Sequence, residues 1–225
     1  ASRTAEANIS LNDYWRKIYF PDAKVSKKKS SWLPEERHFN QWLSSFGEKP
    51  LHQITGDHLT DLRNRLLNKG KAPRTIQHCF STFRLIWNHA KRRGVVQGDC
   101  PTRVVPLGKI QNERTRFLSS SEVQLLLETL KTENLDAYDF AQMALCTGAR
   151  RGELLRLSWQ DVNFRDGELH LIHTKTGEPR TVPIVSELQA VLIRRFESGD
   201  TRFVFERSDG EPWRDVPYAL RRILR

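Results

Sequence analysis

The sequence predicts a mainly α-helical protein with a small antiparallel sheet, and three observations lead to this prediction. Apolar residues recur at helical spacing through most of the chain, most clearly in residues 73–93. The period changes to strand-like alternation only in residues 162–184, where Asp-Gly and Thr-Gly pairs mark turns between three short strands. A polar segment, residues 108–117, follows a stretch broken by prolines and is interpreted as a linker. We therefore expect two domains, residues 1–107 and 118–225.

The composition distinguishes the two halves by charge. The 225 residues carry a net charge of +10. Residues 1–110 contain 20 Lys and Arg against 9 Asp and Glu, whereas residues 111–225 contain 17 against 18. A basic first half joined to a near-neutral second half favours a nucleic-acid clamp followed by a working domain. A general basic bias that aids solubility is the alternative.

Several classes of protein are disfavoured by what the sequence lacks. The three cysteines, Cys79, Cys100 and Cys146, are odd in number and show no Cys-x-x-Cys spacing, so we expect reduced packing residues, not disulfides or metal ligands. There is no P-loop and no cluster of acids suited to magnesium, so no cofactor is expected. Neither a signal peptide nor an apolar run of about 20 residues occurs, so no membrane association is expected.

The first half is expected to form a small bundle of helices. Residues 11–20 have a helical pattern that should stop at Pro21. Residues 34–46 and 55–67 form two further helices, the second of them capped by Thr55.

Three consecutive lysines, Lys27, Lys28 and Lys29, lie in the serine-flanked segment 23–31. A flexible basic loop of this kind is suited to contact phosphates. We therefore predict that the three lysines bind DNA, with a solvated linker as the alternative.

The helix predicted at residues 73–93 has two faces of opposite character. The apolar face should pack in a core and contains Ile76, Cys79, Phe80, Phe83, Ile86, Trp87 and Ala90. The opposite face has no acid, and its side chains are of the kinds that bond phosphates and base edges. We predict DNA contacts for five of them, with a plain solvated face as the alternative: Arg74, Gln77, His78, Arg84 and Lys91.

The second half should begin with helices over residues 122–130 and 138–146, the first capped by a serine among residues 119–121. After the three strands, residues 185–196 return to helix. Further expected elements are a short extended piece at residues 202–205 and the start of a helix near residue 215.

The segment Thr147–Glu153 joins two of the predicted helices and is the strongest candidate for a functional site. Gly148 permits a tight, left-handed turn. Arg150 would then stand at a helix N-terminus, where backbone N–H groups and the helix dipole favour an anion. An arginine in that place suits a phosphate because its planar guanidinium binds two oxygens at once. An ordinary helix corner with solvated arginines is the alternative.

These features together resemble the tyrosine recombinases, the phage integrase family. The matching motifs are TGARRGEL at residues 147–154, TKTGEPRTVPI at 174–184 and R-x-L-S-x-x-E at 116–122. The order of a basic helical domain, a linker and these motifs also fits the family. The resemblance implies an N-terminal helical core-binding (SAM-like) domain, followed by the N-terminal part of a mixed α/β catalytic domain.

The resemblance also implies roles for four residues. Arg150 aligns with the arginine that holds the scissile phosphate, while Arg151 should point to another face. Glu153 matches an acidic position that supports the active site, and at this spacing it can reach back to an arginine or to the chain entering the helix. Lys175 matches the hairpin lysine that protonates the departing 5′-oxygen. Arg180 matches a basic position that contacts backbone phosphate. A solvated turn for Lys175 and a helix-stabilising acid for Glu153 are the alternatives.

The sequence departs from the family pattern after the hairpin. A His-x-x-Arg box, a further His or Trp and a nucleophilic tyrosine should follow, and we expect none of the seven histidines to stand in a His-x-x-Arg setting. Tyr218 precedes the place where the box should lie, so it is interpreted as a packing residue and not as the nucleophile. We therefore expect a C-terminally incomplete chain that binds DNA without cutting it.

The leading functional hypothesis is a site-specific DNA recombinase, an integrase that cleaves and rejoins strands through a 3′-phosphotyrosyl intermediate. The resemblance implies double-stranded DNA as partner, a homotetramer on paired DNA sites with a monomer in the absence of DNA, and a cytoplasmic location in a bacterium or phage-infected cell. A non-catalytic DNA-binding regulator of the same ancestry is the first alternative. A type IB topoisomerase-like enzyme is the second.

Overall fold

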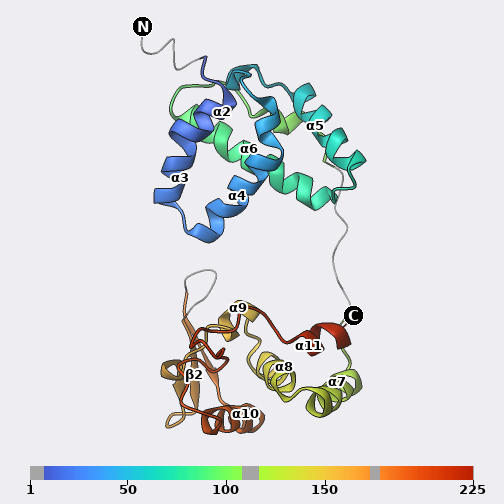
Figure 1. The fold of residues 1–225 in the computed structure, drawn as a ribbon, viewed down its shortest axis with the longest axis vertical. Coiled ribbons are helices and arrows are strands. Elements are labelled where there is room, and N and C mark those ends of the chain that lie inside the picture. The colour runs from blue at the N-terminus through green and yellow to red at the C-terminus, as the bar shows by residue number, and fades with distance from the viewer. Residues whose placement is uncertain (1–7, 108–116, 173–177, 225) are drawn as a thin grey trace. The chain divides into compact units, whose positions relative to one another are not determined.

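The computed structural model describes residues 8–107, 117–172 and 178–224. The chain divides into two compact units between Arg114 and Thr115 (Figure 1), and each unit is described by itself. The assignment of separate functions to residues 1–107 and 118–225 stays a prediction, and the predicted linker lies almost wholly outside the described residues. The predicted fold class is confirmed: the described residues are mainly helical, with one small antiparallel sheet.

The first unit is made entirely of helical elements in its described part. Its α-helices are α2 (Leu11–Tyr14), α3 (Phe20–Ser26), α4 (Lys29–Gln41), α5 (Gly56–Asn68) and α6 (Pro73–Arg92). A π-helical stretch, Trp15–Tyr19, joins α2 to α3, and short 3-10 helices lie at Leu43–Phe46, Leu51–Gln53 and Pro101–Val104.

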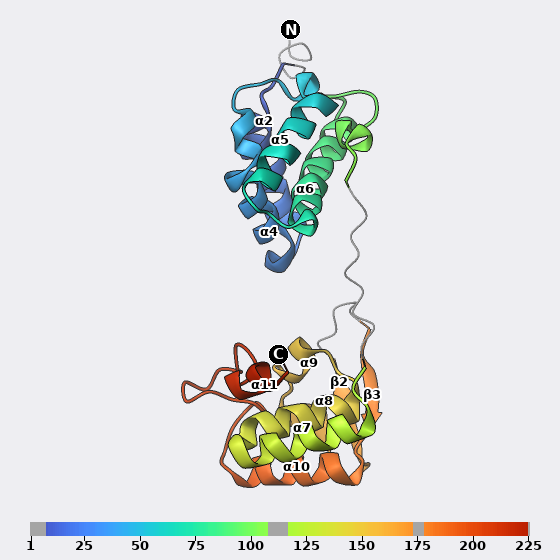
Figure 2. The same cartoon turned by 90° about the vertical axis from the view of Figure 1, so that its right-hand side faces the viewer.

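The helix α6 lies at the centre of the first unit and packs against α4 and α5 (Figure 2). All seven residues predicted for its apolar face are buried, so the periodicity was interpreted correctly. Thr55 caps α5 as predicted, because its hydroxyl accepts from the His58 N–H and the His58 ring accepts from the Thr55 N–H. The burial of Cys79 raises the pKa of its thiol to about 12, as expected for a packing residue.

Pro21 does not end the first helix, contrary to the prediction. Helical structure continues from α2 through the π-helical stretch into α3, and Pro21 is in the first turn of α3. The Phe20 N–H bonds the carbonyl of Trp15, five residues back. A proline is tolerated here because its missing N–H falls where the hydrogen-bond ladder changes register. Pro34 likewise lies inside α4 and does not begin it.

The predicted basic loop over residues 23–31 is also wrong. α3 extends to Ser26 and α4 begins at Lys29, so only two residues separate the helices. Trp32, near the start of α4, packs edge-to-face on Phe20 of α3, with the ring centroids 5.8 Å apart. This contact between two helices is not visible in the charge pattern from which the loop was predicted.

The second unit combines helices with the sheet. Its helices are α7 (Ser120–Glu133), α8 (Leu135–Thr147), α9 (Arg151–Leu154), α10 (Ser186–Glu197) and α11 (Tyr218–Ile223), with a 3-10 turn at Trp159–Asp161. Its strands are β1 (Val162–Asn163), β2 (Glu168–Leu171) and β3 (Arg180–Pro183), in the order β1-β2-β3 and antiparallel throughout.

The helices α7 and α10 pack on α8, and one side of β2 faces the same core (Figure 2). Leu169 and Leu171 are buried, whereas the alternate residues of β2 are not. Ser119 caps α7 with the Glu122 side chain returning to its N–H, as the sequence predicts. Residues 202–204 pair with the chain at residues 157–159, which agrees with the predicted extended piece.

A buried ion cluster joins α8 to α10. Asp139 of α8, only 2% exposed, accepts hydrogen bonds from Arg194 and Arg195 of α10. Arg195 also donates to the carbonyl of Val204 over 2.8 Å, and its guanidinium lies 4.4 Å from the centroid of the Phe205 ring. Two helices that are far apart in sequence are therefore held by one carboxylate.

Three side chains of the second unit lie differently from the predictions. Tyr218 is 71% exposed and is not a packing residue, because it opens α11 while Leu220 of the same helix is buried. Phe164 and Ile172, counted with the strands, lie just beyond β1 and β2 and are exposed. No described helix is long and apolar enough to cross a membrane.

Candidate active site

The corner between α8 and α9 places Arg150. Gly148 ends α8 with φ of 57°, the left-handed conformation that the sequence predicts. The Thr147 hydroxyl donates to the carbonyl of Met143 over 2.6 Å and accepts from the N–H of Ala149 over 3.1 Å. The turn is thus fixed on both sides by one side chain, and Arg150 leaves it as the residue that precedes α9.

Glu153 caps the start of α9 and holds the Arg150 side chain. One carboxylate oxygen accepts from the Arg150 backbone N–H over 2.9 Å, and the other accepts from its guanidinium over 3.0 Å. The sequence left open whether this acid reaches the arginine or the chain entering the helix. It does both.

Arg180 completes the cluster from the sheet. It is the first residue of β3, and its guanidinium donates to Glu153 over 2.7 Å. A single carboxylate therefore joins the helix corner to the base of the β2–β3 hairpin. This contact spans 27 residues of sequence and was not part of the prediction, which gave Arg180 a direct phosphate contact only.

The cluster keeps Glu153 ionised although the residue is only 4% exposed. The hydrogen bond from Arg180 is the main cause, and the bonds from Arg150 add to it, so that the pKa of Glu153 falls to about 2 against the opposing effect of burial. The side chains of Arg150 and Arg180 are 56% and 37% exposed. Each arginine is thus held at one end and has further N–H groups directed to solvent.

Arg150 and Arg180 line one cavity of about 460 Å³. The other described lining residues are Gly148, Glu178 and Pro179. Two guanidinium groups that face the same space and are fixed by a buried acid have the chemistry to hold a doubly coordinated anion such as a phosphate. Glu178, which the sequence did not single out, is an exposed acid at the rim of this site.

Lys175, the third predicted catalytic residue, lies outside the described residues. Arg151 points away from the cluster, as predicted, since it pairs with Asp215 over 2.8 Å and lines a different cavity. Among the described residues, no group of His, Cys, Asp or Glu side chains is placed to hold a metal ion.

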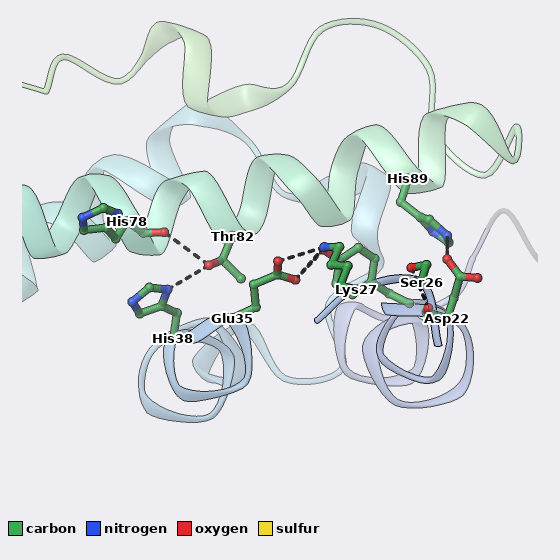
Figure 3. Close-up of polar contacts among 9 residues, drawn as sticks. Asp22, Ser26, Lys27, Glu35, His38, His78, Thr82 and His89 are labelled. Atoms are coloured by element: carbon green, nitrogen blue, oxygen red, sulfur yellow. Dashed lines mark hydrogen bonds and ion pairs between the residues drawn. The ribbon is translucent and has the colours of Figure 1, made fainter. Parts of the chain in front are cut away.

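One His-x-x-Arg tetrapeptide does occur, at His89–Arg92, so the statement that no histidine stands in such a setting is wrong. It lies in α6 of the first unit and precedes Arg150, whereas the family box should follow the hairpin. His89 is buried, and the Tyr14 hydroxyl lies 2.7 Å from its Nδ1. Its Nε2 lies 3.2 Å from a carboxylate oxygen of Asp22 (Figure 3). Burial lowers the pKa of His89 against the opposing effect of Asp22, and the residue packs within the first unit.

The three lysines predicted to contact DNA are not equivalent. Lys27 donates to both carboxylate oxygens of Glu35, over 2.8 and 3.0 Å, and to the Tyr19 hydroxyl over 2.9 Å (Figure 3). Its ammonium group is therefore used within the protein. Lys28 and Lys29 are exposed and have no side-chain partner among the described residues, so they remain available to a ligand.

The buried acid Glu35 is a structural residue that the sequence reading missed. It stands three residues after Trp32 and four before Phe39, on the apolar side of α4, and it is buried. An acid within an apolar stripe indicates a buried partner. That pattern indicates a nearby cation as the partner of Glu35, and Lys27 is that cation.

The predicted DNA-contacting face of α6 is exposed except at its half-buried Gln77. Arg74 donates to Gln77 over 3.2 Å, and the Arg84 Nε–H donates to the Thr102 hydroxyl over 3.3 Å. His78 stacks on His38, with ring centroids 6.3 Å apart. Lys91 has no side-chain partner among the described residues. The face is therefore accessible, and its DNA contacts stay a prediction.

Part of this chain is similar to known proteins. Residues 116–219 match the phage integrase family. A XerC-like tyrosine recombinase of Caldanaerobacter subterraneus is 27% identical over 73% of this chain and 43% of its own length. The shufflon-specific DNA recombinase of Escherichia coli is 39% identical over 39% of this chain and 23% of its own length.

Solved structures share the fold. A lambda integrase dimer bound to a COC′ core site has a TM-score of 0.78 at 18% identity, covering 96% of this chain and 80% of that one. A lambda integrase tetramer bound to a Holliday junction has a TM-score of 0.77 at 18% identity, covering 98% of this chain and 65% of that one. At this identity the likeness establishes the fold alone.

The fold is that of an integrase core, with an arginine-lined cavity at the start of α9. Residues 116–219, which make up most of the second unit and contain all the motifs quoted above, belong to the tyrosine recombinase family, also called the phage integrase family, which confirms the resemblance. The chain spans less than half the length of the XerC-like recombinase that it matches.

Proposed function

We propose that this chain binds double-stranded DNA and supplies part of the active site of a site-specific recombinase. The observation that carries the proposal is the buried Glu153 carboxylate, which fixes Arg150 and Arg180 beside one cavity in a chain of this family. The names of the relatives, which include integrases and DNA recombinases, support the same assignment.

In the proposed reaction, Arg150 holds the scissile phosphate. Its Nε and second terminal nitrogen have no partner among the described residues, so they are free to bind two non-bridging oxygens. Fixed cationic donors stabilise the charge that develops on the pentacoordinate phosphorus, an effect of about 3–4 kcal/mol for a single donor in comparable sites. Arg180 contributes a second cation to the same cavity.

In the proposed chemistry, a phosphodiester bond of the DNA is exchanged for a phosphodiester bond to a tyrosine. The phenolic oxygen attacks phosphorus, the bond to the 5′-oxygen breaks, and Lys175 gives that oxygen a proton. A 3′-phosphotyrosyl link results, and a 5′-hydroxyl of a partner strand reverses the step. We assign neither the nucleophile nor the family's His-x-x-Arg box to any of the 225 residues, and the reaction is proposed for a protein that supplies both.

DNA binding is tested with this chain directly. We expect a duplex to bind with an affinity that falls steeply as salt rises, because phosphate contacts release condensed counterions. Measurement of Kd by fluorescence anisotropy over a salt series gives the number of contacts. Affinity that does not depend on salt would contradict a phosphate-binding protein.

Cleavage is tested in the longest natural chain that contains these residues, using a suicide duplex with a nick. We expect a covalent protein–DNA adduct in denaturing gels, and we expect Arg150→Ala to abolish it while DNA binding is nearly retained. Adduct formation at the wild-type rate by Arg150→Ala would overturn the assignment of Arg150. Binding without any adduct would favour a DNA-binding regulator.

The same assay separates recombination from topoisomerase action. A recombinase joins strands of two sites, and we propose that it assembles as a tetramer on paired sites. Recombinant products and a tetramer on DNA in light scattering are the expected results. Relaxation of supercoils without strand exchange would instead identify a type IB topoisomerase-like enzyme.

A further inference from the structure

A second basic cavity lies beside α9, and Arg151 lines it instead of Arg150. Its volume is about 570 Å³. Four of its described lining residues are arginines and one is an acid: Arg151, Arg156, Arg207, Arg214 and Glu211. The residues come from α9, from the two residues that follow it and from the segment that leads into α11, and Figures 1 and 2 show α9 and α11 at the same end of the second unit.

Two of the four arginines are already neutralised by the protein. Arg151 pairs with Asp215 over 2.8 Å, and Arg207 pairs with Asp209. Arg156 and Arg214 are exposed, and their side chains have no partner among the described residues.

Unpaired guanidinium groups in the wall of a cavity are suited to bind an anionic ligand. An arginine held only for fold stability normally finds a carboxylate or a carbonyl, as Arg195 does in this same unit. Arg156 and Arg214 reach the same space from two separate segments, and the rigid fork of each is matched to phosphate oxygens. The acid Glu211 reduces the positive charge of the cavity without pairing with either arginine.

A duplex bound at the Arg150 cavity would bring further phosphates to this one. α9 has four residues and is about 6 Å long, and Arg150 and Arg151, which line the two cavities, are neighbours in the chain. Along one DNA strand, phosphates recur about every 3.4 Å of helix axis. A ligand with a regular series of phosphates is therefore long enough to reach from one cavity to the other, whereas a single small anion is not.

We propose that the Arg156–Arg214 cavity binds a backbone phosphate of the same DNA that occupies the Arg150 cavity, and that it acts as a second anchoring site outside the catalytic cluster. The proposal rests on the proposed function and deepens it by naming two contact residues. Because the two arginines would contact a phosphate and no base, the contact fixes the position of the DNA and adds no sequence preference.

The test compares Arg156→Ala, Arg214→Ala and the double variant with Arg165→Ala, which removes an exposed arginine outside the cavity. Kd for a duplex is measured from about 50 to 200 mM salt, where phosphate contacts dominate the slope. We expect each single variant to lower the magnitude of the salt slope by about 1, and the double variant by about 2. The control should leave the slope unchanged.

Glu211→Gln provides a test in the opposite direction. Removal of this acid should tighten DNA binding, because the cavity then carries one negative charge fewer and repels phosphate less. A variant that merely disturbs the fold would not bind more tightly, so the result separates electrostatics from unfolding. Circular dichroism and thermal unfolding check that all variants are folded.

The outcomes distinguish the two proposals. If the wild-type chain shows no salt-dependent DNA binding, the proposed function and this inference both fall. If the wild-type chain binds and Arg150→Ala lowers the slope, but the Arg156 and Arg214 variants do not, only the second anchoring site is wrong. Broadening of the phosphorus resonance of inorganic phosphate by the wild-type chain, with unchanged DNA slopes in the variants, would also overturn it.

Discussion

Asp139 and Glu153 are both buried carboxylates that bind two arginines, but the arginines differ in what else they contact. Arg195, one partner of Asp139, is only 12% exposed and donates also to the Val204 carbonyl. Together with Arg194 it links α10 to α8, so this cluster holds two helices of the unit together.

The Glu153 cluster has the same composition and a different environment. Arg150 and Arg180 each give one hydrogen bond to the acid and present the rest of the guanidinium to a cavity. The comparison teaches that the pairing of a buried acid with arginines does not itself indicate function. The donors left over after pairing do, because only they can bind a ligand.

Removal of the acid should be most costly in the closed cluster. We expect Asp139→Ala to lower the free energy of unfolding by about 3–5 kcal/mol, because two arginines at a helix interface lose their counter-charge. Urea unfolding at pH 7 measures the change. Asp136→Ala is the matched control, since this more exposed acid also binds Arg195 and should cost less than about 1 kcal/mol. Equal losses in the two variants would contradict the structural role of Asp139.

Removal of the acid in the open cluster should cost less. We expect Glu153→Gln to lower the free energy of unfolding by about 2–3 kcal/mol, because the hydrogen bonds to a charged group weaken while both arginines stay partly solvated.

The same variant should change the dependence of stability on pH. Folding depresses the pKa of Glu153 from 4.5 to about 2, so its contribution is complete above pH 4.5 and is lost as the pH falls towards 2. Urea unfolding between these values should show a steeper loss for the wild-type chain than for Glu153→Gln. Parallel curves would mean that the acid is not held ionised by the arginines.

In the first unit, Lys27 and Lys28 provide the same contrast, because Lys27 is paired with a buried acid and Lys28 has no side-chain partner among the described residues. We expect Lys27→Met to cost about 2 kcal/mol of stability, since it leaves the buried Glu35 without its counter-ion, and to leave the salt slope of DNA binding unchanged. Lys28→Met should do the reverse and lower the slope by about 1 with stability retained. A lowered slope in Lys27→Met would restore the original prediction for this lysine.

Among the four arginines that bind Asp139 or Glu153, the smallest loss of stability is expected for Arg150, whose side chain is the most exposed of the four. Arg150→Ala should cost about 1 kcal/mol or less, yet lower the salt slope of DNA binding by about 1. Arg194→Ala should destabilise more and leave the slope unchanged. Thermal unfolding and binding are measured on the same samples. If Arg194→Ala lowers the slope and Arg150→Ala does not, the roles assigned to the two clusters are wrong, and the Asp139 cluster is the one that binds DNA.

Features with a local cause could be predicted from the sequence. The apolar face of α6, the caps at Thr55 and Ser119 and the left-handed Gly148 each depend on residues within a few positions of one another. Local hydrogen bonding and helical periodicity decide them, so tertiary packing has little freedom to change them.

The wrong predictions concern residues whose position depends on contacts with groups that are distant in the sequence. The charge run at Lys27 suggested a loop, but the helices on either side are joined by an aromatic contact and the lysine by the buried Glu35. Tyr218 has the composition of a packing residue and is exposed, because the direction of α11 in space decides which of its residues meet the core. Residue type alone contains no information on that direction.

For the candidate site, the sequence by itself determined that an arginine follows a left-handed turn, that an acid stands three residues later, and that the chain belongs with the tyrosine recombinases. Only the tertiary structure decided that Arg180 shares this acid, and that Arg156 and Arg214 meet in a second cavity. The reason is that the strand register and the path of the chain towards α11 bring these groups together, and both depend on the packing of the whole unit.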